Sequence, residues 1–336
     1  MRAAGCDIVV DAKELSVVGI TEILSRLPTI YGLFHKLIAE ADRRRPDLAV
    51  VIDSPAFNWR VARQMRKRGI PVVYYVCPQF WAWRQGRVRL LRKYVTKALV
   101  IFPFEEKFYR DRGVDTAFVG HPLAHLPLPA ISRAAYAAQL QLAEEKPWIT
   151  LMPGSRVKEV GMNLPLILES AGKLGSGYEF LLPVAPTLDR GFLKKLIGNA
   201  PVHMVPQSLP ALYHSRGGII ASGTATVEAA MMGTPFVMVY RVSPLTYLLG
   251  KPRVKVPHFA MVNLIAEREV VPELVQADFT AENVVVHLSE VLPEGAARER
   301  MKLGLAEVKK RLRGTVEDAV QPAERAAAAI LPSALR

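Results

Sequence analysis

Short apolar runs rich in Val and Ile alternate, over the first 120 residues, with longer segments that carry charged residues on one side. The runs are Ile8 to Val10, Leu48 to Ile52, Pro71 to Val76, Ala98 to Ile101 and Thr116 to Val119. Parallel strands buried on both faces are continuous apolar runs, and the segments between them form covering helices. The pattern therefore predicts one Rossmann-like lobe over residues 1–122.

A second set of runs predicts a second lobe over residues 147–279. The expected strands are Trp148 to Met152, Tyr178 to Leu182, Val202 to Val205, Gly218 to Ala221 and Pro235 to Val239. Residues 123–146 have prolines near both ends and no strand pattern, which is typical of an interdomain connection. Residues 280–336 show helical patterns only. The predicted fold class is α/β, with two doubly wound lobes and C-terminal helices.

Composition narrows the function classes without choosing one. The formal net charge of +13 fits nucleic acid, an anionic membrane or phosphorylated small molecules, but aromatics at 8% give no stacking surplus that favours nucleic acid. The two cysteines, Cys6 and Cys77, lack metal-ligand spacing, so neither a disulfide framework nor a zinc site is indicated. No apolar run approaches the ~18 residues of a spanning helix.

Polar motifs follow the expected strands at the edge where doubly wound sheets bind their ligands. After "WITLMP", Gly154 permits a tight approach, Ser155 can cap the next helix, and its free N–H groups form an anion site. Arg156 adds a planar guanidinium suited to two phosphate oxygens. Taken alone, such a turn is more often a simple helix cap.

A second turn, "ASGTATVEAA", places Ser222, Gly223 and Thr224 at another helix start, with Glu228 one turn inside. A carboxylate there can reach ribose hydroxyls, so the two turns together predict a nucleotide-diphosphate site. The chain lacks the Gly-x-Gly-x-x-Gly and Gly-Lys-Ser/Thr motifs, which argues against a dehydrogenase or a P-loop ATPase. No Asp-x-Asp pair follows a strand, so we expect neither a metal nor a cofactor.

The residues carry a specific resemblance to the lipid-A-disaccharide synthase family. The matching stretches, in the family's order, are "ELSVVGITEIL", "PDLAVVIDSPAFN", "YYVCPQFWAWRQGR", "FPFEEKFY", "FVGHPL", "LMPGSRVKEV", "ASGTATVEA", "VYRVSPLT" and "VNLIAEREVVPELVQ". The resemblance implies the GT-B arrangement of two Rossmann-like lobes and no metal. It also implies inverting transfer from UDP-2,3-diacylglucosamine to 2,3-diacylglucosamine 1-phosphate, with UDP released.

Several residues take roles from this resemblance. Asp53 is the candidate general base for the acceptor hydroxyl, with a structural cap as the alternative, and Arg156 stabilises the charge on leaving UDP. The remaining matched donor-site positions are Ser155, Ser222, Thr224, Glu228, Asn263 and Gln276. His121 is either catalytic or a packed capping group, and Tyr240 and Arg241 either line the donor site or end a strand.

The acylated substrates imply a peripheral location on the cytoplasmic face of the bacterial inner membrane. A helix interrupted by Pro28 is expected to present an apolar membrane patch, with a buried helix face as the alternative. Its residues are Ile20, Ile23, Leu24, Leu27, Ile30, Tyr31 and Phe34. Surrounding Arg and Lys residues favour anionic lipid. A homodimer is left open.

The start of the chain departs from the family pattern. Family members open with a strand, a Gly-Glu-x-Ser-Gly-Asp turn, a helix and a second strand, and Met1 matches a position after these. We therefore expect the first lobe to be N-terminally incomplete. Two alternatives stay open: a UDP-binding remnant with little activity, and another two-lobed UDP-sugar enzyme such as a 2-epimerase.

Overall fold

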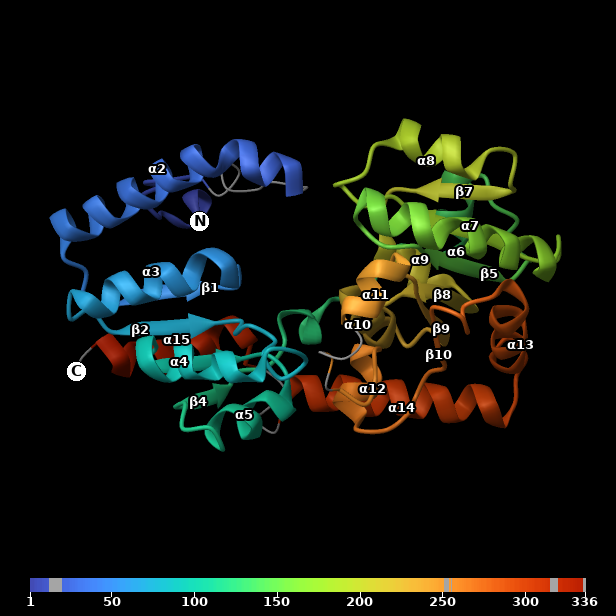
Figure 1. Cartoon of the computed structure of the whole chain (residues 1–336). Coiled ribbons are helices and arrows are strands. Elements are labelled where there is room, and N and C mark those ends of the chain that lie inside the picture. Colours follow the sequence, from blue (N-terminus) through green and yellow to red (C-terminus); the bar gives the residue numbers. More distant parts are fainter. Residues whose placement is uncertain (12–19, 251–253, 255, 315–319, 335–336) are drawn as a thin grey trace.

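Figure 1 shows the protein as a computed structural model, with two α/β lobes beside each other and the last helices returning to the first lobe. The structure describes residues 1–11, 20–250, 254, 256–314 and 320–334. The two-lobed α/β architecture predicted from the apolar runs is confirmed.

The first lobe is built on a four-stranded parallel sheet in the order β1-β2-β3-β4. Its strands are β1 (Ala49–Ile52), β2 (Val72–Tyr75), β3 (Lys97–Val100) and β4 (Thr116–Phe118). Four predicted strands are thus confirmed, but the one at Ile8 to Val10 is wrong, because those residues lie in a half-buried bend outside the sheet. A strand forms only where a neighbouring strand shares its backbone hydrogen bonds, and residues 8–10 pair with no strand in the described part of the chain.

Helices cover both faces of this sheet. The first lobe contains α2 (Ile20–Arg44), α3 (Pro55–Lys67), α4 (Val88–Tyr94), α5 (Pro103–Arg110) and the short 3-10 helices η1 (Arg2–Ala4), η2 (Gln85–Arg87) and η3 (Pro122–His125). Helix α2 continues through Pro28, where the sequence predicts an interruption. Alternate residues of β2 face opposite sides: Val72 and Tyr74 pack with α3 and α4, whereas Val73 packs with Ala326 of the C-terminal helix α15 (Pro322–Ala334).

A buried acid fixes the loop after β2. The carboxylate of Glu105 accepts hydrogen bonds from the Trp81 indole N–H at 2.8 Å and from the N–H groups of Ile101 and Phe102 at 3.1 and 3.0 Å. Burial raises the pKa of Glu105 to about 7. Trp81 is therefore a core residue, while Trp83, two residues on, is 44% exposed.

The second lobe is a six-stranded parallel sheet in the order β10-β9-β8-β5-β6-β7. Its strands are β5 (Trp148–Met152), β6 (Glu179–Pro183), β7 (Val202–Val205), β8 (Gly217–Ala221), β9 (Phe236–Tyr240) and β10 (Glu273–Val275). The five predicted strands are confirmed, and β10 is additional. The sequence between the lobes contains the helix α6 (Arg133–Leu140) and no strand, as expected.

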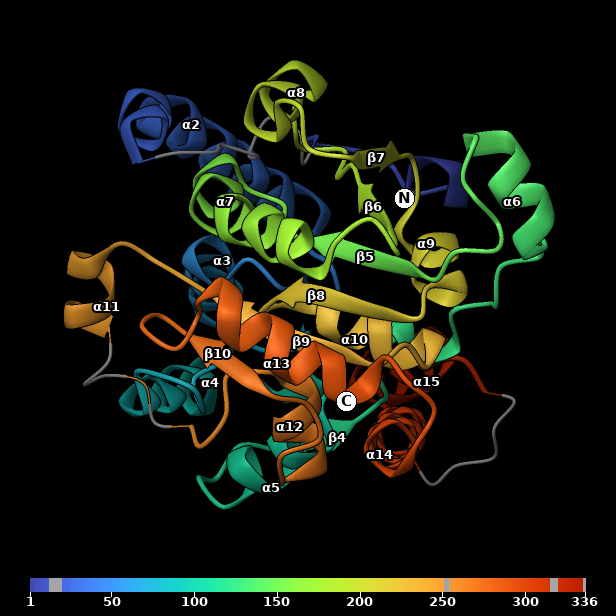
Figure 2. The ribbon, with the colours of Figure 1, turned by 90° about the vertical axis from the view of Figure 1, so that its right-hand side faces the viewer.

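Helices α7 and α13 pack together on one face of this sheet, and α9 and α10 pack on the other (Figure 2). The helices of this half are α7 (Val157–Leu174), α8 (Arg190–Ile197), α9 (Ser208–His214), α10 (Thr224–Met232), α11 (Pro244–Gly250), α12 (Met261–Ala266), α13 (Ala281–Val291) and α14 (Ala296–Arg313). From residue 280 onward the described chain forms helices only, as predicted.

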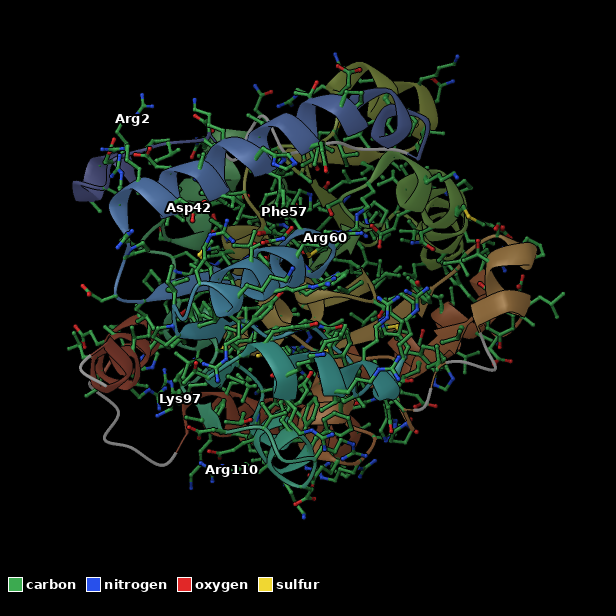
Figure 3. All side chains as sticks on the ribbon, turned by 60° about the vertical axis from the view of Figure 1, so that its left-hand side comes forward. Arg2, Asp42, Phe57, Arg60, Lys97 and Arg110 are labelled. Atoms are coloured by element: carbon green, nitrogen blue, oxygen red, sulfur yellow. The ribbon has the colours of Figure 1, made fainter. Side chains whose placement is uncertain are left out.

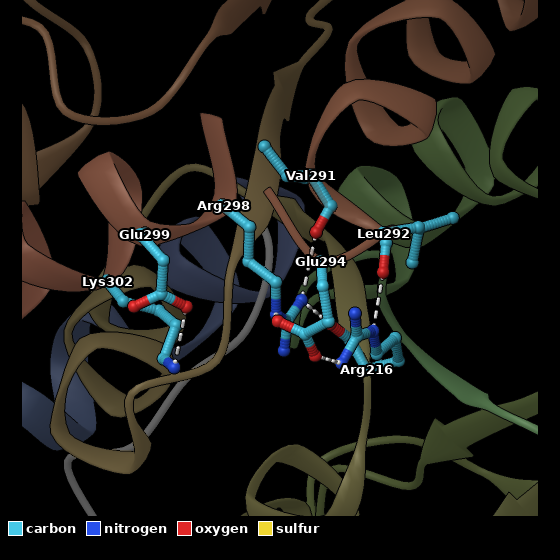
Figure 4. A network of polar contacts seen from close by, with 7 residues as sticks. All are labelled: Arg216, Val291, Leu292, Glu294, Arg298, Glu299 and Lys302. Carbon is cyan, nitrogen blue, oxygen red and sulfur yellow. Dashed lines mark hydrogen bonds and ion pairs between the residues drawn. The ribbon is translucent and has the colours of Figure 1, made fainter. Parts of the chain in front are cut away.

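A polar network fastens α13 and α14 to the start of β8 (Figure 4). Arg298 donates to the carbonyl of Arg216 at 2.7 Å and to that of Val291 at 2.9 Å. The Arg216 guanidinium donates to the Leu292 carbonyl and pairs with Glu294. These bonds anchor the chain before α14 carries it back toward the first lobe.

Candidate functional site

The strand order of the second sheet reverses between β5 and β8, which lie side by side although five helices and strands separate them in sequence. Ligands of doubly wound sheets bind at such a switch point, outside the carboxyl ends of the strands. A cavity of about 940 Å³ lies there, lined by the turns that follow β5, β6, β7 and β8 and by residues 127–130 of the interdomain connection. The topology therefore creates the site.

The turn after β5 presents backbone amides and an exposed cation. Gly154 has φ +121°, a conformation that residues with a side chain rarely adopt. Arg156, not Ser155 as predicted, is the N-cap residue of α7, and its side chain makes no capping bond. Arg156 is exposed and makes no ion pair within the described residues. Its guanidinium is thus available to an anion in the cavity.

The turn after β8 adds hydroxyls and a carboxylate. Gly223, at φ +141°, is the N-cap of α10, and Thr224 is exposed at its first position. The hydroxyl of Ser222 donates to the Phe259 carbonyl at 2.9 Å, so its side chain already has a partner. Glu228 lies one turn further on, where burial raises its pKa and a hydrogen bond from Ser208 opposes that shift.

Seven of the predicted site residues line this one cavity. They are Gly154, Ser155, Arg156, Ser222, Gly223, Thr224 and Glu228. Sequence reasoning missed Ser208, which lines the same cavity and donates to Glu228 Oε2 at 2.8 Å. The sequence could have indicated Ser208, because it lies just after the predicted strand Val202 to Val205. Ligands of doubly wound sheets bind beyond such strand ends.

Two predicted donor-site residues lie outside this cavity. Asn263 is fully buried and its amide bonds with the main chain of Val270 and Val271 and with Glu273. Gln276 exchanges two side-chain hydrogen bonds with the main chain of Val242, at 2.7 and 3.1 Å. Both side-chain amides thus hold the loops around β10, and neither residue lines the cavity.

Asp53 directly follows β1 in the first lobe, at the carboxyl edge of its sheet. Asp53 and Ser54 both have left-handed backbone conformations, with φ of 47° and 45°. The Asp53 carbonyl accepts from the Asn58 amide at 2.7 Å and from the Tyr74 hydroxyl at 2.8 Å. Its carboxylate is exposed and makes no hydrogen bond or ion pair in the part of the chain that the structure describes. A strained, exposed acid at a strand end is a candidate for chemistry.

His121 is buried at the junction between the lobes. Its imidazole Nδ1 accepts from the Leu123 N–H at 3.1 Å, and its main-chain N–H donates to the Leu312 carbonyl at 3.2 Å. Burial lowers the pKa of the imidazole to about 4. The imidazole is therefore neutral at pH 7 and caps η3. Arg241 stacks on Phe279 and donates to two carbonyls beside β10, so it ends its strand outside the cavity lining.

The predicted membrane patch is only partly described. The side chains of Ile20, Ile23, Leu24 and Leu27 lie outside the described residues. Tyr31 is 65% exposed and Ile30 is half-buried. Phe34 packs edge-to-face on Phe57, with ring centroids 5.8 Å apart, so it joins α2 to α3 instead of facing outward. Among the described helices, none is long and apolar enough to cross a bilayer.

The fold and the cavity define a two-lobed α/β protein with a ligand site at the switch point of its second sheet. The calicheamicin glycosyltransferase CalG4 superimposes with a TM-score of 0.57 at 17% identity, covering 99% of this chain and 86% of that one. A UDP-GlcNAc 2-epimerase from Neisseria meningitidis bound to UDP-GlcNAc gives a TM-score of 0.52 at 13% identity, covering 91% and 82%. At these identities the likeness shows the fold alone.

Sequence comparison identifies the family. A family profile described as lipid-A-disaccharide synthetase matches residues 1–328. The lipid-A-disaccharide synthase of Koribacter versatilis is 52% identical over 342 residues, covering 100% of this chain and 89% of that protein. The enzyme of the same name from Acidobacterium capsulatum is 47% identical, covering 93% and 82%. This chain therefore belongs to the lipid-A-disaccharide synthetase family, and the predicted resemblance is confirmed.

Proposed function

We propose that this chain transfers 2,3-diacylglucosamine from UDP-2,3-diacylglucosamine to 2,3-diacylglucosamine 1-phosphate, with inversion at the anomeric carbon and release of UDP. The observation that carries this assignment is the cavity at the β5/β8 switch point. It combines amides and the exposed Arg156 at one turn with the Glu228 carboxylate at another. Such a set suits a diphosphate at one end and ribose hydroxyls at the other.

The two lobes divide the chemistry in this proposal. Residues 147–279 hold the donor, where Arg156 and the amides of the β5–α7 turn stabilise the negative charge that grows on the departing UDP. Residues 1–122 hold the acceptor, where Asp53 removes the proton from its 6-hydroxyl as that oxygen attacks the anomeric carbon. The Asp53 carboxylate is exposed and makes no ion pair with any described residue, which supports this role.

A product assay tests the reaction. The purified chain is incubated with both acylated sugars, and the products are separated and identified by mass. Disaccharide and UDP in equal amounts are expected. An epimerised sugar with no disaccharide would identify an epimerase, and UDP binding without any product would identify a binding remnant.

We propose further that the protein acts at the cytoplasmic face of the bacterial inner membrane. Between Asp53 and Glu105 the chain has eleven Lys and Arg residues and no Asp or Glu. Nine of these cations are exposed and make no ion pair among the described residues: Arg60, Arg63, Arg66, Lys67, Arg84, Arg87, Arg89, Arg92 and Lys93. They lie on α3, on α4 and in the segment before α4, and we call this surface the α3–α4 basic face.

Figure 3 shows this side of the first lobe, with Arg60 labelled on α3 and Lys97 at the start of β3. Basic residues near an anionic bilayer contribute about 1 kcal/mol each. We expect cosedimentation with vesicles that contain phosphatidylglycerol, and little with pure phosphatidylcholine. The double substitution R89E/R92E is expected to reduce binding strongly, while R190E/K194E on α8 makes the same charge change in the other lobe as a control. If both variants lost vesicle binding to the same extent, the α3–α4 basic face would not be the contact surface.

A further inference from the structure

The chain's own carboxylate lies at the position where a phosphate is expected to bind. Glu159 Oε2 accepts a hydrogen bond from the Ser155 N–H at 3.1 Å, at the start of α7. The carboxyl group lies against Gly154, since a Cβ built at that glycine would stand 2.3 Å from its carbon. The open space beside the turn's amide is thus filled by Glu159, which itself lines the cavity.

Helix capping alone does not account for this geometry. A Glu at the third helical position commonly bonds back to the N–H of the N-cap residue. Here the N-cap is Arg156, and the bond goes one residue further, to Ser155 in the turn. The Arg156 guanidinium, three residues from Glu159, makes no ion pair with it in the described structure. An incoming anion would therefore find the Arg156 guanidinium exposed, and it would have to displace Glu159 to reach the Ser155 amide.

We infer that Glu159 is a specificity-determining residue which occupies the phosphate position in the free protein and is displaced when the donor diphosphate binds. This inference rests on the proposed donor site. A carboxylate and a phosphate are both oxyanions, so they compete for the same N–H and repel each other when close. The half-buried Glu159 side chain has solvent beside it into which it can turn.

Selectivity for the whole nucleotide follows from this competition. A small anion gains only the contacts at the β5–α7 turn when it displaces Glu159. A UDP-sugar also gains contacts with the Glu228 side of the cavity, so it offsets the displacement more readily. The returning carboxylate also weakens the hold on UDP after the transfer, which favours release of the product.

Calorimetric titration with UDP tests the inference through Glu159→Gln. This variant keeps a hydrogen-bond acceptor for the Ser155 N–H and removes the negative charge. We expect it to bind UDP about tenfold more tightly than the wild type, the effect of removing one repulsive charge near a protein surface. Glu169→Gln, at an exposed position late in the same helix, removes the same charge far from the cavity and is expected to bind UDP as the wild type does.

A second variant and the thermal unfolding curve separate the outcomes. Glu159→Ala is expected to tighten UDP binding as well, and it decides the matter if Glu159→Gln does not fold. A purely structural cap would instead give a lower melting temperature with unchanged or weaker UDP binding, and that result overturns the inference. If the wild type and every variant fail to bind UDP, the proposed donor site falls and the inference with it. If the wild type binds and neither variant binds tighter, only the inference falls.

Discussion

The carboxyl ends of the two sheets hold their candidate residues by different means. In the second lobe, β8 is buried at every position and pairs with β5 and β9, so the turns that follow these strands are fixed by neighbours on both sides. In the first lobe, β1 pairs with β2 alone, and Val50 and Ile52 are 40% and 46% exposed. A turn after such an edge strand has fewer constraints from the sheet.

Local hydrogen bonds replace these constraints at Asp53. The Asn58 amide donates to the carbonyls of Ile52 and Asp53 at 2.8 and 2.7 Å, and the Tyr74 hydroxyl donates to Asp53 as well. The position of the donor cavity thus depends on sheet topology, whereas the position of the proposed base depends on one amide, one hydroxyl and two residues in the left-handed conformation. Substitutions at the two sites should therefore differ in what they change.

The largest effect is expected from Arg156→Ala. Removing one donor that stabilises transition-state charge typically lowers the rate by about 10²–10³-fold. Steady-state kinetics should show this loss, while circular dichroism and thermal unfolding remain those of the wild type. Lys158→Ala, an exposed cation two residues away that does not line the cavity, is the matched control. A near-normal rate in R156A would remove Arg156 from the mechanism.

Asp53→Asn should lower the rate by about 10²-fold and leave UDP affinity unchanged, because a general base acts in the transition state. Asp47→Asn changes an exposed acid at the opposite end of β1 and should have little effect. The measurements are kcat with both substrates and calorimetric UDP binding. If kcat were the same in Asp53→Asn and Asp47→Asn, Asp53 would be a structural cap with no part in the chemistry.

His121 tests the junction between the lobes through the pH dependence of stability. Its pKa is about 4 in the folded protein against an ordinary 6.5, so the unfolded chain binds the proton more readily. The contribution of the neutral His121 to the free energy of unfolding is therefore fully present above pH 6.5. It is lost as the pH falls toward 4, by up to about 3 kcal/mol. Urea unfolding at several pH values should show a shallower fall for His121→Gln. His35→Gln, which removes an exposed imidazole, is the control, and equal slopes in all three proteins would contradict the assignment.

The smallest effect is expected from Glu228→Gln. Losing the carboxylate that Ser208 orients should weaken UDP binding by about fivefold, since charged hydrogen bonds exceed neutral ones by roughly 1 kcal/mol. Uridine binding should weaken in parallel if Glu228 contacts the ribose. The change is opposite in sign to that expected for Glu159→Gln in the same cavity. Glu290→Gln on the exposed side of α13 controls for net charge.

The strands were predictable where an apolar run was long enough to be buried on both faces. Nine of them appear as expected, whereas β10 was missed because Glu273–Val275 is short and begins with an acid. Glu273 is accommodated there because its carboxylate accepts from the N–H groups of Phe259 and Ala260 at 2.8 and 3.0 Å. Those donors come from a loop 13 and more residues away, which no local pattern indicates.

The sequence by itself determined the alternation of strands and helices, the two lobes, the family, and the turns that line the donor cavity. Each of these depends on local chemistry: apolar runs, glycines at turns, and polar residues just after strands. Only the tertiary structure decided that β5 and β8 are neighbours, so that Arg156 and Glu228 share a cavity. It also set the Glu159 carboxylate on the Ser155 amide, four residues away, instead of on the N-cap amide. It alone directed the Asn263 and Gln276 side chains to the main chain around β10, because partner groups 7 to 34 residues away in sequence fix where those two side chains point.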